Sequence, residues 1–280
     1  MHGITNLEIL SNDAGRWGNQ LFRIATMIGY AKQYNLKYYI SNTWQYKDYF
    51  NFGDNLYDIN DILLNIKYKH SQNGFHYEDI PYIESGIIDI HGFYQSYKFF
   101  DHAKDDIIEL FWSNKNLIED IKSKYNIGSN TLSIHIRGGD IFDRMRGGGY
   151  YRNEHHHPVM TIKYYNDALI EILKNVNINK ILIFTDHEQT KNSIKGHINT
   201  HGIFTEYVDY KNEFIYDFFA QALCDHFIIA NSSFSWWAAY IGRNKNKMVC
   251  SPYKNNWFGP GYGYYIMDDL IPPNWINISQ

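Results

Sequence analysis

The first chemically suggestive stretch runs from Thr131 to Asp140 and reads T-L-S-I-H-I-R-G-G-D. Its apolar half predicts a buried strand, which leads into Arg137, two glycines and Asp140. A strand that carries His135 and Arg137 into a glycine turn places polar groups at the carboxyl end of a sheet, where open α/β sheets bind ligands. Arginine suits a phosphate because its planar fork makes two charge-assisted hydrogen bonds. A salt-bridged arginine at a strand end is the structural alternative.

Three other loops carry polar groups at predicted junctions between a strand and a helix. The glycine-containing loop Asn12–Gln20 precedes a helix, whose free N–H groups favour an anion. In N-S-S-F-S at 231–235, Ser232 or Ser233 is expected to cap the next helix, whether it only caps or whether a phosphate also uses the N–H groups there. Asp186 ends another strand, and it either caps a helix or accepts hydrogen bonds from a base or sugar.

A basic segment follows the first of these strands. Arg144, Arg146 and Arg152 flank three glycines at 147–149, which predicts a flexible loop over 143–155 that closes on an anionic ligand. A solvated surface loop is the alternative.

The sequence predicts no metal site. His155, His156 and His157 are consecutive, so their side chains diverge on a strand or helix. The chain has no H-E-x-x-H, no paired C-x-x-C and no D-x-D triplet. It also lacks the P-loop and G-x-S-x-G patterns of phosphoryl transfer and α/β-hydrolases.

Composition narrows the class further. The 280 residues are 44% hydrophobic and carry a net charge of -4, so a core is expected, whereas a global basic field for nucleic acid is not. Cys224 and Cys250 are the only cysteines, which argues against a disulfide scaffold and favours a reducing compartment. We find neither a leader pattern nor an apolar run of about 18 residues, so we expect a cytoplasmic protein without a membrane span.

The hydrophobic pattern predicts an α/β protein with two domains, 1–128 and 129–280. The second half alternates strands and helices, which indicates a parallel sheet. Its expected strands are 132–136, 180–185, 204–208, 226–230 and 248–251, and its expected helices are 161–174, 188–197, 213–224 and 234–243. The first half is predicted to contain strands at 7–11 and 38–41 and helices at 21–31 and 101–124. Aromatic residues in the irregular stretch 44–100 either fill the core or form a wall that stacks on sugars, and residues 252–280 are expected to fold back over the body.

Three segments together resemble a known family. G-R-W-G-N-Q at 15–20, H-I-R-G-G-D at 135–140 and N-S-S-F-S-W-W-A-A at 231–239 are similar, in order and spacing, to the three characteristic segments of family 11 α-1,2-fucosyltransferases. That family lies within a wider group that includes α-1,6- and protein O-fucosyltransferases. The resemblance implies a GT-B type fold, with two Rossmann-like domains facing across a cleft. It also implies a metal-independent inverting transfer of L-fucose from GDP-β-L-fucose.

The resemblance assigns the strand-end residues to the donor, which makes 129–280 the domain expected to bind the GDP-sugar and 1–128 the domain expected on the acceptor side. Arg137 would hold the β-phosphate and stabilise departing GDP, and His135 would line the guanosine or donor pocket. Asn19 would reach the fucose and phosphate, and Asp186 would read guanine. The implied donor-binding set is Arg16, Gly18, Asn19, His135, Arg137, Asp186, Ser232, Ser233 and Phe234, where Ser233 and Phe234 meet the pyrophosphate. The implied catalytic set is Arg137, Asn19 and Asp140.

Two positions depart from the family pattern. Gly138 replaces the second arginine of His-x-Arg-Arg-x-Asp, and His187 follows Asp186 where the family often has a second acidic residue. The candidate bases for the acceptor hydroxyl are Asp140, Asp143 and Glu154.

The expected acceptor is a glycan that contains galactose, which would be linked α-1,2, or another sugar hydroxyl. A glycosyltransferase of other donor or linkage, and a non-catalytic nucleotide- or glycan-binding module, are the alternatives.

Overall fold

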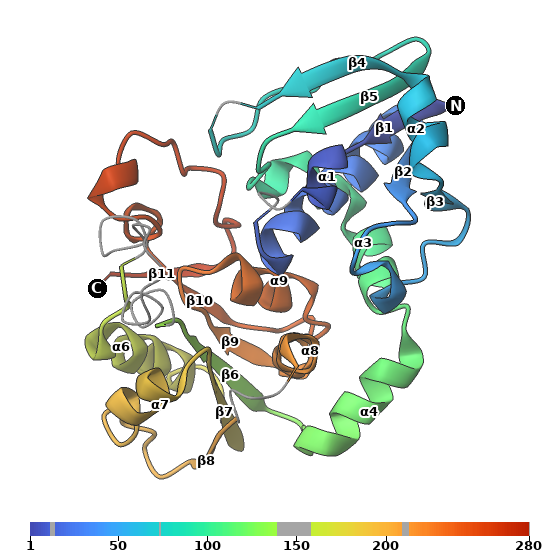
Figure 1. Ribbon diagram of the computed structural model, residues 1–280. Coiled ribbons are helices and arrows are strands. Elements are labelled where there is room, and N and C mark those ends of the chain that lie inside the picture. Colours follow the sequence, from blue (N-terminus) through green and yellow to red (C-terminus); the bar gives the residue numbers. More distant parts are fainter. Residues whose placement is uncertain (12–14, 73, 139–157, 209–212, 280) are drawn as a thin grey trace. The chain divides into compact units, whose positions relative to one another are not determined.

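The computed structural model describes residues 1–11, 15–72, 74–138, 158–208 and 213–279 (Figure 1). The chain divides into two compact units. The first is Met1–Leu117 with Tyr265–Pro272, and the second is Ile118–Tyr264 with Pro273–Gln280. Among the described residues, each unit is built on one parallel sheet. The roles that the sequence assigned to domains 1–128 and 129–280 stay predictions.

The described strands of the first unit lie in the order β3-β2-β1-β5-β4. They are β1 His2–Thr5, β2 Lys37–Ser41, β3 Leu56–Tyr57, β4 Ile66–Ser71 and β5 Gly86–His91. Helix α1 (Trp17–Tyr34) packs on β1 and β2, α2 (Ile59–Asn65) packs on β2 and β5, and α3 (Lys104–Phe111) packs on α1. Helix α1 ends where Asn35 adopts a left-handed conformation with φ 53°.

A segment from near the C-terminus completes the first unit. Leu270 is fully buried. The Tyr77 backbone N–H donates to Asp269 Oδ2 at 3.0 Å, and the Tyr97 N–H donates to the Asp269 carbonyl at 3.2 Å. Lys98 Nζ lies 2.5 Å from Asp269 Oδ1. Residues 265–272 therefore supply both apolar packing and hydrogen-bond acceptors to elements nearly two hundred residues earlier in the sequence.

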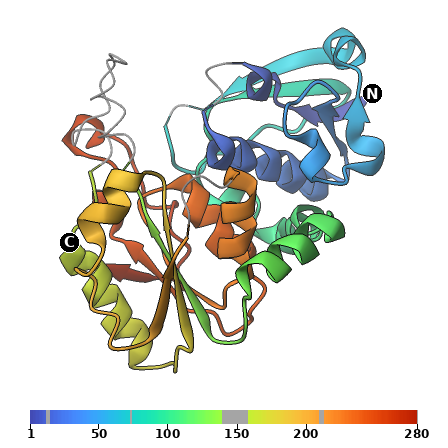
Figure 2. The ribbon, with the colours of Figure 1, turned by 60° about the horizontal axis from the view of Figure 1, so that its bottom comes forward.

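The described strands of the second unit lie in the order β11-β10-β9-β6-β7-β8. They are β6 Thr131–Ile136, β7 Lys180–Thr185, β8 Phe204–Tyr207, β9 His226–Ile228, β10 Val249–Pro252 and β11 Ile276–Ile278. Among the described residues, the helices are α4 Lys115–Tyr125, α6 Ile162–Leu173, α7 Glu188–Ile194, α8 Phe214–Leu223 and α9 Ser233–Ile241. The order is that of a doubly wound sheet, in which the strand order reverses beside the first strand, β6. Figures 1 and 2 show α6 and α7 on one face of this sheet and α8 and α9 on the other.

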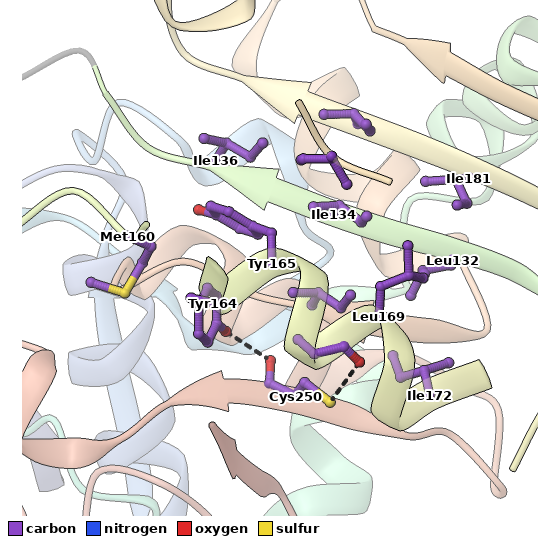
Figure 3. Packing of buried hydrophobic residues seen from close by; sticks show 14 of the residues in the cluster. Leu132, Ile134, Ile136, Met160, Tyr164, Tyr165, Leu169, Ile172, Ile181 and Cys250 are labelled. Atoms are coloured by element: carbon purple, nitrogen blue, oxygen red, sulfur yellow. Dashed lines mark hydrogen bonds between the residues drawn. The ribbon is translucent and has the colours of Figure 1, made fainter. Parts of the chain in front are cut away.

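Side-chain alternation along β6 decides which residues enter the core. Leu132, Ile134 and Ile136 are buried against α6, where they pack with Tyr165 and Leu169 (Figure 3). Because successive side chains of a strand point to opposite faces, Ser133, His135 and the following Arg137 are directed to the face covered by α8 and α9. The core therefore fixes the orientation of the polar residues at the end of β6.

The structure corrects the sequence prediction in several places. Residues Leu7–Leu10 form a short 3-10 helix rather than a strand, because Asn6 Oδ1 accepts the Ile9 N–H at 3.1 Å; the first strand is β1. The helix expected over 101–124 is interrupted between α3 and α4, where the Lys115 N–H donates to the Ser113 carbonyl. Strand β11 was not predicted. Other short 3-10 helices in the described ranges are Lys47–Tyr49, Gly53–Asn55, Tyr97–Phe99, Asp101–Ala103, Lys254–Asn256 and Pro260–Tyr262.

Candidate functional site

The candidate site of the second unit lies at the carboxyl ends of β6 and β9. These strands are parallel neighbours, with Leu132 opposite His226 and Ile134 opposite Ile228. From β6 the chain goes on to β7 and β8 on one side, and from β9 it goes on to β10 and β11 on the other. Ligands of open α/β sheets bind at such a reversal point.

The structure brings two of the predicted junctions together there. His135 Nδ1 lies 2.9 Å from Ser235 Oγ, and the His135 ring lies 5.8 Å from the Phe234 ring. Arg137 Nη1 donates to the Asn231 carbonyl at 3.3 Å. Segments about one hundred residues apart in the sequence therefore share one edge of the sheet, with a half-buried guanidinium between them.

His135 is a buried, neutral part of this site. Its side chain is 6% exposed, and burial lowers its pKa from 6.5 to about 4; the Asp186 carboxylate opposes this shift and Arg137 adds to it. The ring is therefore uncharged near neutral pH, which leaves Arg137 as the fixed positive charge at the end of β6. The Tyr165 hydroxyl donates to the His135 carbonyl at 3.2 Å and holds this end of the strand against the core.

Helix α9 begins at the second junction. Ser232 is its N-cap, and the Ser232 Oγ accepts the Phe234 N–H at 3.3 Å. Capping is thus confirmed for Ser232, whereas Ser233 is the first residue of the helix. A phosphate at the same N–H groups stays a prediction. Asn231 anchors the junction, since its Nδ2 donates to the carbonyls of Pro158 at 2.8 Å and Trp257 at 3.1 Å. The sequence did not single out Asn231, although its position three residues after the end of β9 was a usable signal.

Asp186 joins a third strand end to the same site. Its Oδ1 accepts the Gly138 N–H at 2.9 Å, so the carboxylate holds the turn that follows Arg137. The N-cap of α7 is His187, whose Nδ1 accepts the Gln189 N–H at 3.1 Å. The alternative in which Asp186 caps that helix is therefore wrong.

Gly138 has no space for a side chain. A Cβ at this position would lie 2.2 Å from Thr190 Oγ1, 2.9 Å from Cγ2 and 3.1 Å from Cβ. Among the described residues, the buried Thr190 hydroxyl has no hydrogen-bond partner. The departure from the family pattern at Gly138 is thus matched by a threonine that closes the space, and an arginine at 138 requires a change at 190.

This packing leads to a stability prediction. Gly138→Ala is expected to lower the free energy of unfolding by about 1–3 kcal/mol, the usual cost of overpacking. Adding Thr190→Ala removes the two closest atoms, so the double variant is expected to recover most of the loss. Urea unfolding of the wild type, both single variants and the double variant measures this coupling. Equal losses in Gly138→Ala and the double variant would contradict the packing argument.

The first unit contributes the junction before α1. Arg16 is the N-cap residue and makes no side-chain capping hydrogen bond; Gly18 and Asn19 lie in the first turn. Gln20 Nε2 donates to the Gly15 carbonyl at 2.8 Å, and Trp44 Nε1 donates to Gln20 Oε1 at 2.8 Å. The Gln20 amide therefore connects the loop at Gly15 to Trp44. Asn19 Oδ1 accepts a hydrogen bond from Gln95 Nε2 at 3.0 Å. Gln95 was not predicted, because no local motif marks it.

Several predicted residues lie outside the described ranges. They are the candidate bases Asp140, Asp143 and Glu154, the basic loop 143–155, and the histidines 155–157.

Within the described ranges, no group of three or more His, Cys, Asp or Glu side chains could hold a metal ion. Metal independence stays a prediction. None of the helices in the described part of the chain combines the length and the apolarity needed to cross a membrane.

Two parallel α/β units, one of them with its polar residues at the reversal point of a doubly wound sheet, are typical of the GT-B type of fold. A solved structure of POFUT1 in complex with GDP-fucose supports this class: it superimposes with a TM-score of 0.53 at 10% identity and covers 88% of this chain and 96% of that one. At this identity the likeness concerns the fold alone. The α/β, GT-B type expectation is confirmed.

Sequence comparison identifies the family. The model of Glycosyl transferase family 11 matches residues 14–278, so the chain belongs to that family, and the resemblance drawn from the three segments is confirmed. Membership places the chain among glycosyltransferases, the enzyme class that the sequence predicted.

Two curated relatives come from Escherichia coli. The O-antigen biosynthesis glycosyltransferase WbnK is 29% identical over 66% of this chain and 59% of its own length. An alpha-1,2-colitosyltransferase is 26% identical over 70% of this chain and 64% of its own length. The chain therefore spans less than two thirds of either relative.

Proposed function

We propose that the chain transfers L-fucose from GDP-β-L-fucose to a sugar hydroxyl with inversion, giving an α-1,2 linkage to galactose. The observation that carries this proposal is the meeting of Arg137 with the N-terminus of α9 at the reversal point of the second sheet. Family membership supplies the reaction class. A solved structure of similar fold, that of POFUT1, is a complex with GDP-fucose.

The chemistry follows from where charge develops. Cleavage of the bond between fucose and GDP leaves negative charge on the β-phosphate. Fixed donors aimed at such a charge are usually the largest catalytic term. Arg137 supplies a planar donor, and the N-terminus of α9 supplies backbone N–H groups and the positive end of a helix dipole. His135, neutral beside them, forms a wall of the donor site, and Asp186 reads guanine in this proposal.

Product analysis tests the proposal. The protein is incubated with GDP-fucose and a panel of galactosides, and products are identified by mass spectrometry and linkage analysis. Fucose joined α-1,2 to galactose, with one GDP released per transfer, is the expected result. GDP binding without any product from the panel would instead favour a non-catalytic module.

A second donor has a specific observation in its favour. One relative is an alpha-1,2-colitosyltransferase, so a colitosyl donor is the competing candidate. The same panel run with GDP-colitose separates the two, since the preferred donor has the higher kcat/KM. A higher value for the colitosyl donor would keep the α-1,2 transfer and replace fucose.

Metal independence gives a separate prediction. GDP affinity is expected to stay within about twofold when EDTA is added, because in this proposal the charge of the diphosphate is met by Arg137 and helix N–H groups. Isothermal titration calorimetry with and without EDTA measures this, and a parallel titration with added Mg²⁺ is the control. Loss of GDP binding on chelation would contradict it.

The proposed partners are GDP-fucose and a galactose-containing glycan. We further propose a cytoplasmic location. Cys224 and Cys250 are both free and buried, which is compatible with a reducing compartment.

A further inference from the structure

Gln95 is a buried polar residue on the loop that follows β5. Its side chain is 4% exposed, and its Nε2 donates to Asn19 Oδ1 at 3.0 Å. A buried amide is stable only when its hydrogen bonds are made, so this contact is a specified feature of the loop rather than incidental packing.

The backbone around Gln95 is held in an unusual conformation. Tyr94 has φ 53° although it is not glycine, and it is fully buried. The Ser96 N–H donates to the Tyr94 carbonyl at 2.8 Å, which makes Gln95 the central residue of a tight turn. Left-handed residues of this kind cost about 1–3 kcal/mol and persist where the surroundings fix them, often at functional sites.

Side chains from three other elements fix this loop. The Gly92 N–H donates to Glu8 Oε2 at 2.8 Å, and Arg23 Nε donates to the Gly92 carbonyl at 2.6 Å. The Tyr94 N–H donates to Gln72 Oε1 at 2.6 Å. Glu8 Oε1 also lies 3.2 Å from His91 Nδ1, and His91 Nε2 lies 2.9 Å from Asp89 Oδ2. The position of Gln95 is thus determined by the packed end of the sheet.

The contact fixes which way the Asn19 amide faces. A carboxamide has one acceptor oxygen and one donor NH2 group, so an oxygen committed to Gln95 prevents the amide from flipping. The Asn19 Nδ2 then lies beside Gly15, where a Cβ would be only 2.5 Å away. Gly15 has φ +74°, a conformation that favours glycine, and its missing side chain leaves room for the NH2 group.

We propose that Gln95 is the positioning residue for Asn19: it holds the Asn19 amide with its oxygen inward and its NH2 group as the donor offered to the sugar nucleotide. The inference rests on the proposed function for its effect on turnover, whereas the amide orientation itself does not depend on that function. Gln95 acts through Asn19 and does not touch substrate.

Gln95→Glu is the decisive variant because it keeps the shape and reverses the hydrogen bond. The ionised carboxylate cannot donate, so the Asn19 amide flips to donate to it and presents its oxygen to the ligand. We expect kcat to fall about 10–100-fold, the usual effect of losing an orienting partner. The melting temperature should fall, because a carboxylate at this 4% exposed position loses its hydration, so kcat is compared well below the melting temperature of both proteins. Gln33→Glu, at an exposed position of α1, is the matched control and should keep wild-type kcat.

Two kinetic readouts separate positioning from a structural role. Asn19→Ala and Gln95→Glu should be non-additive, so that the double variant is no slower than Asn19→Ala alone. The ratio of variant to wild-type kcat should rise as pH falls, because a protonated carboxyl at position 95 can donate again. Glu8, Arg23, His91 and Asp89 surround the loop in both proteins, so their contribution cancels in the ratio.

An NMR measurement tests the orientation without activity. In the wild type, NOEs should join the Asn19 Hδ2 protons to the Gly15 α-protons, and Gln95→Glu should abolish them. Absence of these NOEs in the wild type overturns the inference, as does a folded Gln95→Glu variant with kcat within about twofold of wild type, or additive losses with Asn19→Ala. Failure of the wild type to form any product overturns the proposed function instead and leaves the NMR outcome to decide the orientation.

Discussion

Arg137→Ala is expected to lower kcat by about 10²–10³, because a donor aimed at charge that develops in the transition state contributes mainly to turnover. The guanidinium lies between the end of β6 and the start of α9, where its Nη1 contacts the Asn231 carbonyl. Arg137→Lys is expected to recover little, since a point charge cannot replace a planar fork. Values of kcat and KM for GDP-fucose, measured for each variant, give the partition between binding and turnover.

Folding of the Arg137 variants is the necessary control. The residue follows β6 rather than lying inside it and is half-buried, so the melting temperature is expected to change by only a few degrees. Lys245→Ala, at an exposed position in the turn after α9, should leave both kcat and stability unchanged. A folded Arg137→Ala protein with near-normal kcat would remove Arg137 from the mechanism, whereas a variant that does not fold would favour a purely structural role.

The second large effect is a loss of stability in mild acid that depends on His135. Burial lowers the folded-state pKa of His135 to about 4, against 6.5 for an exposed ring. Between these values the unfolded chain binds a proton that the folded chain does not, so stability falls as pH decreases from 6.5 towards 4 and is fully present above 6.5. The loss from this group is about 2 kcal/mol at pH 5.

Comparison with His135→Asn isolates this contribution. Asparagine keeps a polar atom near Ser235 Oγ but does not titrate in this range. Urea unfolding at pH 7.5 and 5 should show a smaller loss in the variant than in the wild type. The pKa values of His70 and His226 are also lowered by burial, and both proteins retain them. His201→Asn, at an exposed position with φ 52°, is the control and should keep the wild-type pH dependence. Equal pH profiles for wild type and His135→Asn would contradict the assignment.

The sequence was most informative where structure is local. In the second unit, apolar runs of strand length alternate with amphipathic segments, and all five predicted strands there and all four predicted helices occur within a few residues of the expected ends. The same locality placed His135, Arg137 and Ser232 at strand ends. Because parallel neighbours align their carboxyl ends, adjacency of β6 and β9 was sufficient to bring these residues together.

The failures come from interactions that local patterns do not contain. Leu7–Leu10 looked like a strand by hydrophobicity, but the Asn6 side chain competes for the backbone and starts a helical turn. Gln95 reaches Asn19 only because β1 and β5 are parallel neighbours in the sheet. The two residues are 76 positions apart in the sequence. Strand β11 follows a segment that belongs to the other unit, so no alternation of strand and helix precedes it.

The return of residues 265–272 to the first unit has a consequence for synthesis. Proteins emerge from the ribosome N-terminus first, and domains generally fold in that order as they appear. Here the stretch 1–117 is released without residues 265–272, which contribute the buried side chain of Leu270 and the hydrogen bonds of Asp269 to Tyr77 and Tyr97. The second unit, by contrast, has nearly all its strands before residue 265 is made. The half of the chain that is translated first is therefore completed only near the end of synthesis, shortly before β11 completes the second unit.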